Sequence, residues 1–275
     1  SRYRIAVLGD ELTVSGGKQT NYLRLLERQL PNIEILNFSM PRAGPREYAA
    51  LLADHVAQYE PDLVLCFLSV ADDIAEQSSA PDFFDWRGLQ LNQFATYAGA
   101  NLPGSCAESS QKANNFLAHR GQQLSICRSP TSNKMSACWQ EARLHLGALA
   151  GQCDRQHLPL AFVLIPADFQ INEVLLGTLQ RRTAASQVDI GLPQRRLVQI
   201  ARQLKLPVLD LLPQLKASTR PTHVHRQNQL SQRGNLLVAA AVGQWIERSY
   251  GNRIAEIAGR SGTLTAALRS ETGRK

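Results

Sequence analysis

Three short apolar runs constrain the fold of this chain more than any other feature. They cover residues 4–8, 33–38 and 62–68, and the third, DLVLCFL, is apolar at both sets of alternating positions. A strand that is apolar on both faces is typical of a parallel sheet covered by helices on both sides. Residues 19–30 and 46–58, between the runs, are expected to be helices. The resulting βαβαβ order predicts a doubly wound α/β domain with right-handed crossovers.

The alternation of strands and helices stops between about residues 78 and 134, where Ser, Asn, Gln and Gly predominate. We expect an insertion there. The pattern then resumes with a helix over 136–154, a strand over 160–165, a helix over 193–204 and a strand over 207–211. A last helix is expected to begin behind Ser231 as its N-cap. The sequence therefore predicts one domain over residues 1–250, followed by a small, polar, basic and mobile tail over 251–275.

The cysteines bear on the cellular compartment. Cys66 lies in an apolar run and is expected to be a core thiol, whereas Cys106, Cys127, Cys138 and Cys153 cluster in one polar segment. An even number of clustered cysteines is typical of disulfide-bonded, exported proteins. We therefore expect two disulfides and an exported protein, with four reduced thiols as the alternative because the spacing fixes none of the three pairings. Since the first residue is not Met, we also expect a trimmed or mature form without its targeting segment.

Charge and hydropathy limit the partners. No apolar run approaches the roughly 20 residues that a membrane-spanning helix needs. The net charge of +7 favours anionic partners such as an acidic glycan. The chain has no recognisable nucleic-acid-binding module, so we expect no nucleic-acid partner.

Four segments are expected to form the functional crevice, because ligands bind beyond the carboxyl ends of the strands in open parallel sheets. These segments are residues 9–17, 39–44, 69–74 and the loop 223–234 that enters the last helix.

The first two of these segments resemble conserved blocks of the SGNH (GDSL-type) hydrolases. Residues 7–13, VLGDELT, are similar to the Gly-Asp-Ser-Leu block, with Asp10 matching and Glu11 at the position of the nucleophilic serine. Residues 37–44, NFSMPRAG, resemble the second block, whose glycine N–H serves the oxyanion hole; Gly44 matches that glycine.

The last two segments resemble the other blocks of the same family. Residues 67–74, FLSVADDI, are similar to the Gly-x-Asn-Asp block, with Asp72 at the asparagine position and Asp73 matching the following aspartate. Residues 227–234, QNQLSQRG, resemble the block that carries the catalytic aspartate and histidine, with Gln227 and Gln229 at those positions.

The resemblance implies a three-layer, flavodoxin-like SGNH hydrolase fold in which the catalytic residues are substituted. A serine triad needs a hydroxyl nucleophile, an imidazole base and an orienting carboxylate. The aligned positions hold none of them, and an anionic Asp72 reverses the electrostatics of an oxyanion hole. We predict a non-catalytic relative, without cofactor or metal, that binds a ligand such as an anionic glycan or an acetylated carbohydrate. Two alternatives are an esterase or acetyl-transfer enzyme with a shifted residue set, and an assembly domain of an exported complex.

Other residues of the crevice allow further hypotheses. His223 or His225 could supply a base, and Ser15, Ser39 or Ser69 a hydroxyl. The acids Asp10, Glu11, Asp72 and Asp73 could together bind a hard cation or perform acid–base chemistry. In the structural alternative, Glu11 pairs with an arginine such as Arg42 or Arg46.

Overall fold

Each apolar run of the sequence forms a strand of one parallel sheet. The computed structural model describes residues 2–15, 19–75, 106–184, 187–224, 227 and 229–272, with only the backbone for 106–112 and 260–272. Five parallel strands lie in the order β2-β1-β3-β4-β5. They are β1 (Tyr3–Leu8), β2 (Ile33–Asn37), β3 (Leu63–Ser69), β4 (Leu160–Ile165) and β5 (Val208–Asp210). The central strands β3 and β4 are buried along their whole length, as their two-sided apolar pattern predicts.

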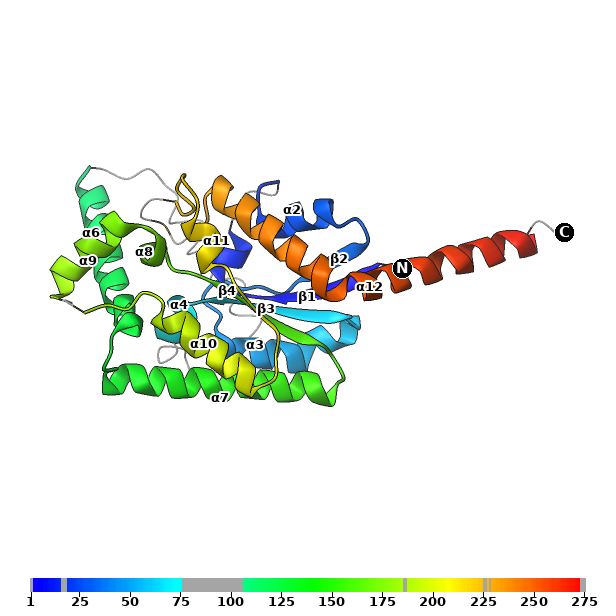
Figure 1. Ribbon diagram of the computed structural model, residues 1–275, viewed down its shortest axis with the longest axis horizontal. Helices are drawn as coiled ribbons and strands as arrows, with labels where there is room; N and C mark the ends of the chain where they lie inside the picture. The colour runs from blue at the N-terminus through cyan, green and yellow to red at the C-terminus, as the bar shows by residue number, and fades with distance from the viewer. Residues whose placement is uncertain are drawn as a thin grey trace.

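Helices cover both faces of this sheet and give a three-layer architecture (Figure 1). One face packs against α2 (Tyr22–Gln29), α11 (Leu212–Lys216) and α12 (Gln232–Thr272). The other packs against α3 (Pro45–Leu51), α7 (Asn133–Arg155) and α10 (Leu192–Gln203). The predicted helix over residues 46–58 continues past α3 as a π-helical turn (Leu52–Val56) and a 3-10 turn (Ala57–Tyr59). The doubly wound α/β fold predicted from the sequence is confirmed.

Part of the expected insertion contributes to the hydrophobic core. Residues 76–105 lie outside the described residues, but α6 (Cys106–Gln123) and a 3-10 turn (Leu124–Cys127) follow them. Leu124, Ile126 and Cys127 are fully buried in the core on the α7 side of the sheet. Although this segment is polar in composition, it contains the helix α6, and the buried residues after the carboxyl end of α6 fix it to the core.

The last helix begins where the sequence predicts, because the Ser231 hydroxyl accepts a hydrogen bond from the Gly234 N–H at 3.0 Å. It ends much later than expected: α12 continues to Thr272, so the backbone of the expected tail is helical over residues 251–272. Figure 1 shows this end of α12 extending beyond the sheet. No helix in the described part of the chain is long and apolar enough to cross a membrane.

Helices α8 (Asp168–Ile171), α9 (Glu173–Thr183) and α11 were not predicted from the sequence. Helices α8 and α11 span four and five residues, too few to show a helical period. Helix α9 exposes Val174 at 80% of its surface and buries Leu179 completely, so its apolar residues do not form one clear stripe.

The prediction of two disulfides is wrong. Cys127, Cys138 and Cys153 are free and buried, and two bridges would require all four clustered cysteines. Cys138 and Cys153 both lie on α7, about 22 Å apart along its axis at 1.5 Å per residue, whereas bridged Cα atoms lie within about 7 Å. Burial raises the pKa of Cys153 to about 12, and burial, with a smaller effect of Asp189, raises the pKa of Cys127 to about 12.

These thiols should react with an alkylating agent only after unfolding, because a buried thiol with a raised pKa supplies little thiolate. Treating the denatured protein with iodoacetamide, without any reductant, should modify Cys66, Cys127, Cys138 and Cys153, as read by peptide mass. The native protein should leave the same four peptides largely unmodified. Peptides that become reactive only after reduction would contradict this assignment.

Candidate functional site

The carboxyl ends of β1 and β2 meet at the first block of the candidate site. Asp10 caps the short helix α1 (Glu11–Val14), its Oδ1 accepting a hydrogen bond from the Leu12 N–H at 3.0 Å. A Cβ atom on Gly9 would lie 2.3 Å from Thr13 Oγ1, so this tight turn into α1 requires glycine. Glu11 therefore occupies the first helical position, half-buried at the rim of the sheet.

The Glu11 carboxylate reaches across to the segment after β2. Its Oε2 accepts a hydrogen bond from the backbone N–H of Arg42 at 3.0 Å. Arg42 has a positive φ of 62°, a left-handed conformation that is uncommon for residues other than glycine. The structural alternative predicted a salt bridge from Glu11 to an arginine such as Arg42 or Arg46; the contact with Arg42 is instead a hydrogen bond from its backbone amide.

Gly44 lies nearby at the N-cap of α3, with its backbone N–H directed at an internal acceptor. That N–H donates a hydrogen bond to Glu47 Oε2 at 2.9 Å. Glu47 stands three residues into the helix, as in a capping box. The amide that corresponds to an oxyanion-hole donor is therefore already satisfied by a carboxylate of the same chain.

Asp72 begins α4 (Asp72–Ala75) after β3 and is held by three side chains. Its Oδ2 accepts the Ser69 hydroxyl at 2.8 Å. Its Oδ1 accepts Gln123 Nε2 at 2.5 Å and lies 3.4 Å from Arg120 Nη1. Burial alone would raise the pKa of Asp72, but the Arg120 guanidinium, with the hydrogen bonds from Ser69 and Gln123, lowers it below the ordinary value. Asp72 is thus a stabilised anion.

Arg120 joins this group to a second carboxylate. Its side chain is only 2% exposed, and its Nε lies 3.2 Å from Asp168 Oδ1 at the start of α8. The guanidinium also lies over the Phe116 ring, 5.6 Å from its centroid. Burial raises the pKa of Asp168 even though Arg120 favours its ionised form. We refer to Asp72, Arg120, Gln123 and Asp168 as the Arg120 network.

The structures of several ester hydrolases share this architecture. The esterase EstA from Pseudoalteromonas sp. matches with a TM-score of 0.50 and 14% identity, over 90% of this chain and 97% of that one. The acetyl xylan esterase AlAXEase matches with a TM-score of 0.53 and 13% identity, over 88% and 99%. A protein assigned to the G-D-S-L lipolytic family, from Desulfitobacterium hafniense, matches with a TM-score of 0.50 and 11% identity, over 88% and 99%. This chain has the SGNH hydrolase fold. No protein-family model and no curated protein sequence matches it, so the relationship is visible in the fold.

A second pair of SGNH block residues, Asp10 and Asp73, lies buried beneath the rim. Asp73 Oδ2 accepts the Ser69 N–H at 2.8 Å, and its Oδ1 accepts the Tyr48 hydroxyl at 3.1 Å. Burial and the neighbouring acids Glu11 and Asp72 raise the pKa of Asp10 well above its ordinary value. Burial and the charge of Asp10 do the same to Asp73. Burial and mutual repulsion therefore favour a proton on this pair, since two neighbouring buried carboxyls do not both ionise cheaply.

Backbone contacts join the described residues around the SGNH histidine position. The Val224 N–H donates to the Gln229 carbonyl at 2.9 Å, and the Gln227 N–H to the Val224 carbonyl at 3.2 Å. A β-bridge links His223 to Leu230. Gln227 is exposed and Gln229 half-buried, while His225 lies outside the described residues.

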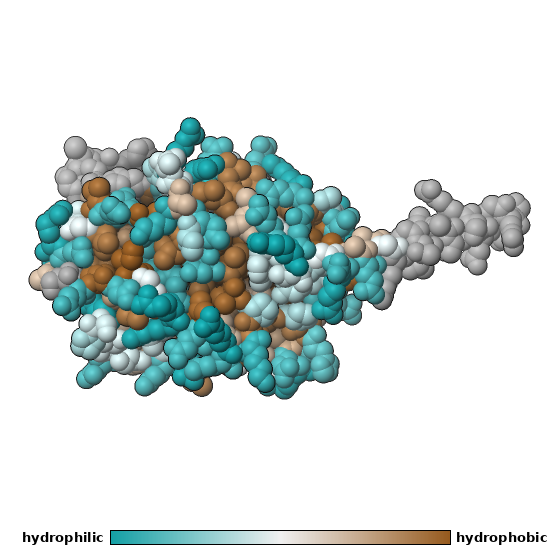
Figure 2. Space-filling model, in the orientation of Figure 1, coloured by the Kyte–Doolittle hydropathy of each residue, from teal (hydrophilic) through white to brown (hydrophobic). Residues whose placement is uncertain are grey.

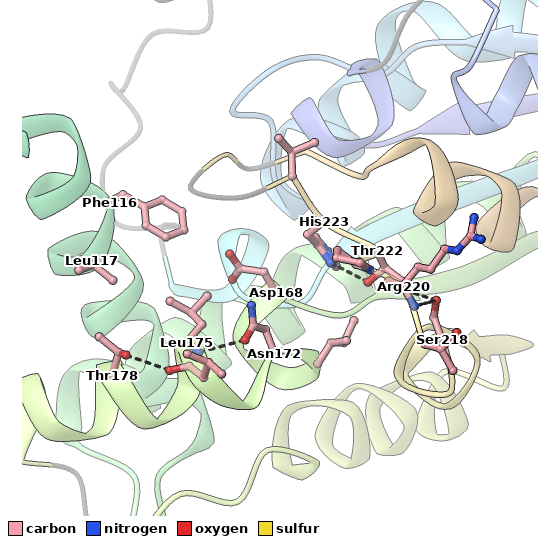
Figure 3. A pocket seen from close by; sticks show the side chains of 15 residues that line it. Phe116, Leu117, Asp168, Asn172, Leu175, Thr178, Ser218, Arg220, Thr222 and His223 are labelled. Atoms are coloured by element: carbon pink, nitrogen blue, oxygen red, sulfur yellow. Dashed lines mark hydrogen bonds between the residues drawn. The ribbon is translucent and has the colours of Figure 1, made fainter. Parts of the chain in front are cut away.

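His223, weighed above as a substitute base, lies in the wall of a cavity together with Asp168 (Figure 3). Burial, and then the charge of Arg120, lower the pKa of His223 to about 4. Its imidazole is therefore neutral at physiological pH.

The hydroxyls considered as substitute nucleophiles have structural partners in two cases. The Ser15 hydroxyl donates to the Leu12 carbonyl at 3.2 Å, and the Ser69 hydroxyl donates to Asp72. Both are buried. Asp72, which accepts the Ser69 hydroxyl, has a lowered pKa and is therefore a weak base. It is poorly suited to removing the proton of a nucleophilic serine.

The hypothesis of a cation site gains no support in the described part of the chain. No group of three or more His, Cys, Asp or Glu side chains there is arranged to hold a metal ion. The charge that balances Asp72 is instead the Arg120 guanidinium, which comes from the segment expected to be an insertion.

Replacing Arg120 with Met should destabilise the protein by about 3–5 kcal/mol, because it leaves buried carboxylates without their cation. Urea denaturation at pH 7 measures this loss. The matched control is Arg195→Met, which removes an exposed ion pair with Asp189 and should cost about 0–1 kcal/mol. The double variant Arg120→Met, Asp72→Asn should recover part of the loss. Equal, small losses in the two single variants would contradict a structural role for the Arg120 network.

The buried Asp10–Asp73 pair should make stability fall as pH rises. An unfolded aspartate ionises near a pKa of about 3.9, whereas the folded pair keeps a proton at higher pH, so the folded state binds more protons above pH 4. Asp10→Asn, which retains the acceptor for Leu12, should lose this slope and gain stability relative to wild type between pH 4 and pH 8. Denaturation at several pH values measures the difference.

Asp189 supplies a control of opposite sign for this experiment. A hydrogen bond from Arg195 lowers the pKa of Asp189, so its contribution is lost as pH falls. Asp189→Asn should therefore change the slope in the opposite direction. The raised pKa of the pair would be refuted if the free energy of unfolding of the wild type rose steadily from pH 4 to pH 8 and that of Asp10→Asn changed in parallel.

Proposed function

We propose that this chain is a non-hydrolytic SGNH-fold domain that binds a ligand. The observation that carries the proposal is the Asp72–Arg120 pair. Hydrolysis of an ester places negative charge on the substrate oxygen in the transition state, and that charge needs donors directed at it. At the asparagine position of the fold there is instead an anion whose partners are Arg120, Gln123 and Ser69.

Two further contacts support the same conclusion. At the serine position, the Glu11 carboxylate accepts the Arg42 N–H. At the glycine position, the Gly44 N–H donates to Glu47. A carboxylate so close to an incoming ester carbonyl would repel the developing oxyanion, and an amide that is already bonded offers it no stabilisation. The residues at the positions of the nucleophile and of the oxyanion-hole donors are therefore engaged in hydrogen bonds within the chain.

The names of the similar structures support one ligand class. Two of the similar structures are named as esterases, one of them an acetyl xylan esterase. A domain in which the hydrolytic residues are substituted can still bind the class of molecule that its binding site accepts, because binding does not require the catalytic groups. For this chain we propose an acetylated carbohydrate as the ligand class.

The wild-type protein should hydrolyse p-nitrophenyl acetate no faster than Glu11→Ala, and a fluorophosphonate probe should not label it, because neither an activated serine nor a base is in place. Release of p-nitrophenolate and intact mass measure these outcomes. As a positive test, Glu11→Ser, Asp72→Asn, Gln227→Asp and Gln229→His combined should gain a weak esterase rate.

A different result would support the shifted-residue esterase. A wild-type rate well above that of Glu11→Ala, abolished by Ser69→Ala or His223→Ala in a variant with unchanged circular dichroism, would contradict the non-hydrolytic proposal. Separate reaction of the probe with Ser15, Ser39 or Ser69, located by peptide mass, would identify the nucleophile.

A further inference from the structure

A cavity of about 630 Å³ lies beside the Arg120 network, outside the rim that carries Glu11 and Gly44. Its walls come from α6, from α8 with α9, and from the loop 218–224 before α12 (Figure 3). This volume falls within the roughly 300–1,000 Å³ of small-molecule sites. Figure 2 shows apolar side chains gathered around α8 and α9 on the same side of the molecule.

The wall formed by the loop is held in place by several contacts. The Ser231 hydroxyl donates to the Pro221 carbonyl at 2.7 Å, and the Ser231 N–H to the Thr222 carbonyl at 2.9 Å. A Cβ atom on Gly234 would approach the Thr222 carbonyl oxygen to 2.1 Å, so only glycine allows α12 to begin this close to the loop. The wall is therefore built before any ligand arrives, which lowers the entropic cost of binding.

The opposite walls are fixed just as firmly. Arg120 ties α6 to Asp72 and Asp168. The Asn172 side chain caps α9 by accepting the Leu175 N–H at 3.0 Å. These contacts hold Phe116 and Leu175 across the cavity from His223, as Figure 3 shows.

The lining combines an apolar side with a polar side. Phe116, Leu117 and Leu175 form the apolar side. On the polar side, the Asp168 carboxylate is paired with Arg120 and the His223 imidazole is neutral.

Among the lining residues that the structure describes, the other charged residue is Arg220, which is exposed and whose guanidinium points away from Asp168 and Phe116 (Figure 3). Asp168 shares Arg120 with the Asp72 anion, so the described polar side carries no excess of positive charge. An anion entering the cavity would meet the Asp168 carboxylate and lose its hydration there.

We infer that this cavity binds a neutral glycoside, with its sugar hydroxyls on Asp168 and His223 and its apolar substituent against Phe116 and Leu175. A carboxylate is a strong acceptor for hydroxyl groups, and an imidazole can donate and accept. An aromatic ring and a leucine offer a flat apolar surface to a sugar face or an acyl group. The inference rests on the proposed function as a binding domain and selects neutral sugars over the anionic glycans that the net charge suggested.

The test uses probes that share one aglycone. The p-nitrophenyl β-D-glucoside, β-D-xyloside and N-acetyl-β-D-glucosaminide are neutral, and the β-D-glucuronide carries a carboxylate. Ligand-detected NMR titration of the full chain should show binding of at least one neutral probe, at least about tenfold tighter than the glucuronide. Absence of binding by all three neutral probes, or tighter binding of the glucuronide, overturns the inference.

Variants locate the site. Leu175→Trp should fill the cavity and weaken binding at least about tenfold, and Phe116→Ala, which removes the stacking surface, should weaken it by a similar factor. The matched control is Leu144→Trp on α7, whose side chain is 68% exposed and distant from the cavity lining. Thermal melts identify any variant that fails to fold.

The two proposals fail in different ways. Unchanged affinity in both folded cavity variants overturns the site assignment and leaves the non-hydrolytic proposal standing. If the wild type hydrolyses p-nitrophenyl acetate while Leu175→Trp still weakens binding of the neutral glycoside, the non-hydrolytic proposal is contradicted. The assignment of the glycoside to the cavity then still stands.

Discussion

The buried guanidinium of Arg120 is the interaction on which the site end of this molecule depends. It connects three segments that are distant in sequence: α6, the end of β3 through Asp72, and the start of α8 through Asp168. A buried charge is tolerated only when it is paired and hydrogen-bonded. Arg120 therefore fixes the position of α6 relative to the sheet edge, and with it one wall of the neighbouring cavity. The proposed function and the architecture therefore depend on the same ion pair.

The sheet and the rim of the site could be predicted from sequence because both depend on local patterns. Strands buried on two faces read as continuous apolar runs, and β3 and β4 lie within a residue of the predicted positions. The rule that parallel strands present their carboxyl ends at one edge predicted that the segments of Glu11 and Arg42 lie together, although their contact is a backbone hydrogen bond and not the salt bridge that was expected. None of this required knowledge of side-chain contacts.

The network partners could not be predicted in the same way, because an ion pair 48 residues apart in sequence leaves no local signal. One signal was nevertheless available. Phe116, Arg120 and Gln123 recur at helical spacing, which places them on one face of α6. A polar residue on such a face has to find a buried partner. Asp72 was the carboxylate for which the sequence predicted no specific cationic partner, and Arg120 supplies the positive charge that pairs with it.

The mistaken disulfides have a related cause. Cys138 and Cys153 were judged by the polar composition around them, but they continue a stripe on α7 with Ala142, Leu146 and Leu149. At helical spacing a cysteine behaves as a small apolar side chain that fits beneath a helix. When the two signals disagree, the helical spacing of cysteines among apolar residues is a better guide than their closeness in sequence. Helical spacing indicates which residues are buried together, whereas closeness in sequence does not.

The energetics of the Arg120 network also explain why the proposed non-hydrolytic state would be difficult to reverse. Exchanging Asp72 alone for asparagine removes one of the two carboxylates that balance Arg120, and removing Arg120 alone leaves both carboxylates buried without their cation. Breaking a buried pair costs about 3–5 kcal/mol, against a total stability of about 5–15 kcal/mol for a typical domain. Asp72→Asn costs less than the removal of Arg120, because Arg120 keeps Asp168 as its partner, but it removes the anion that accepts the Ser69 and Gln123 hydrogen bonds. In the proposed non-hydrolytic state, the Arg120 network therefore opposes the return of an asparagine at position 72.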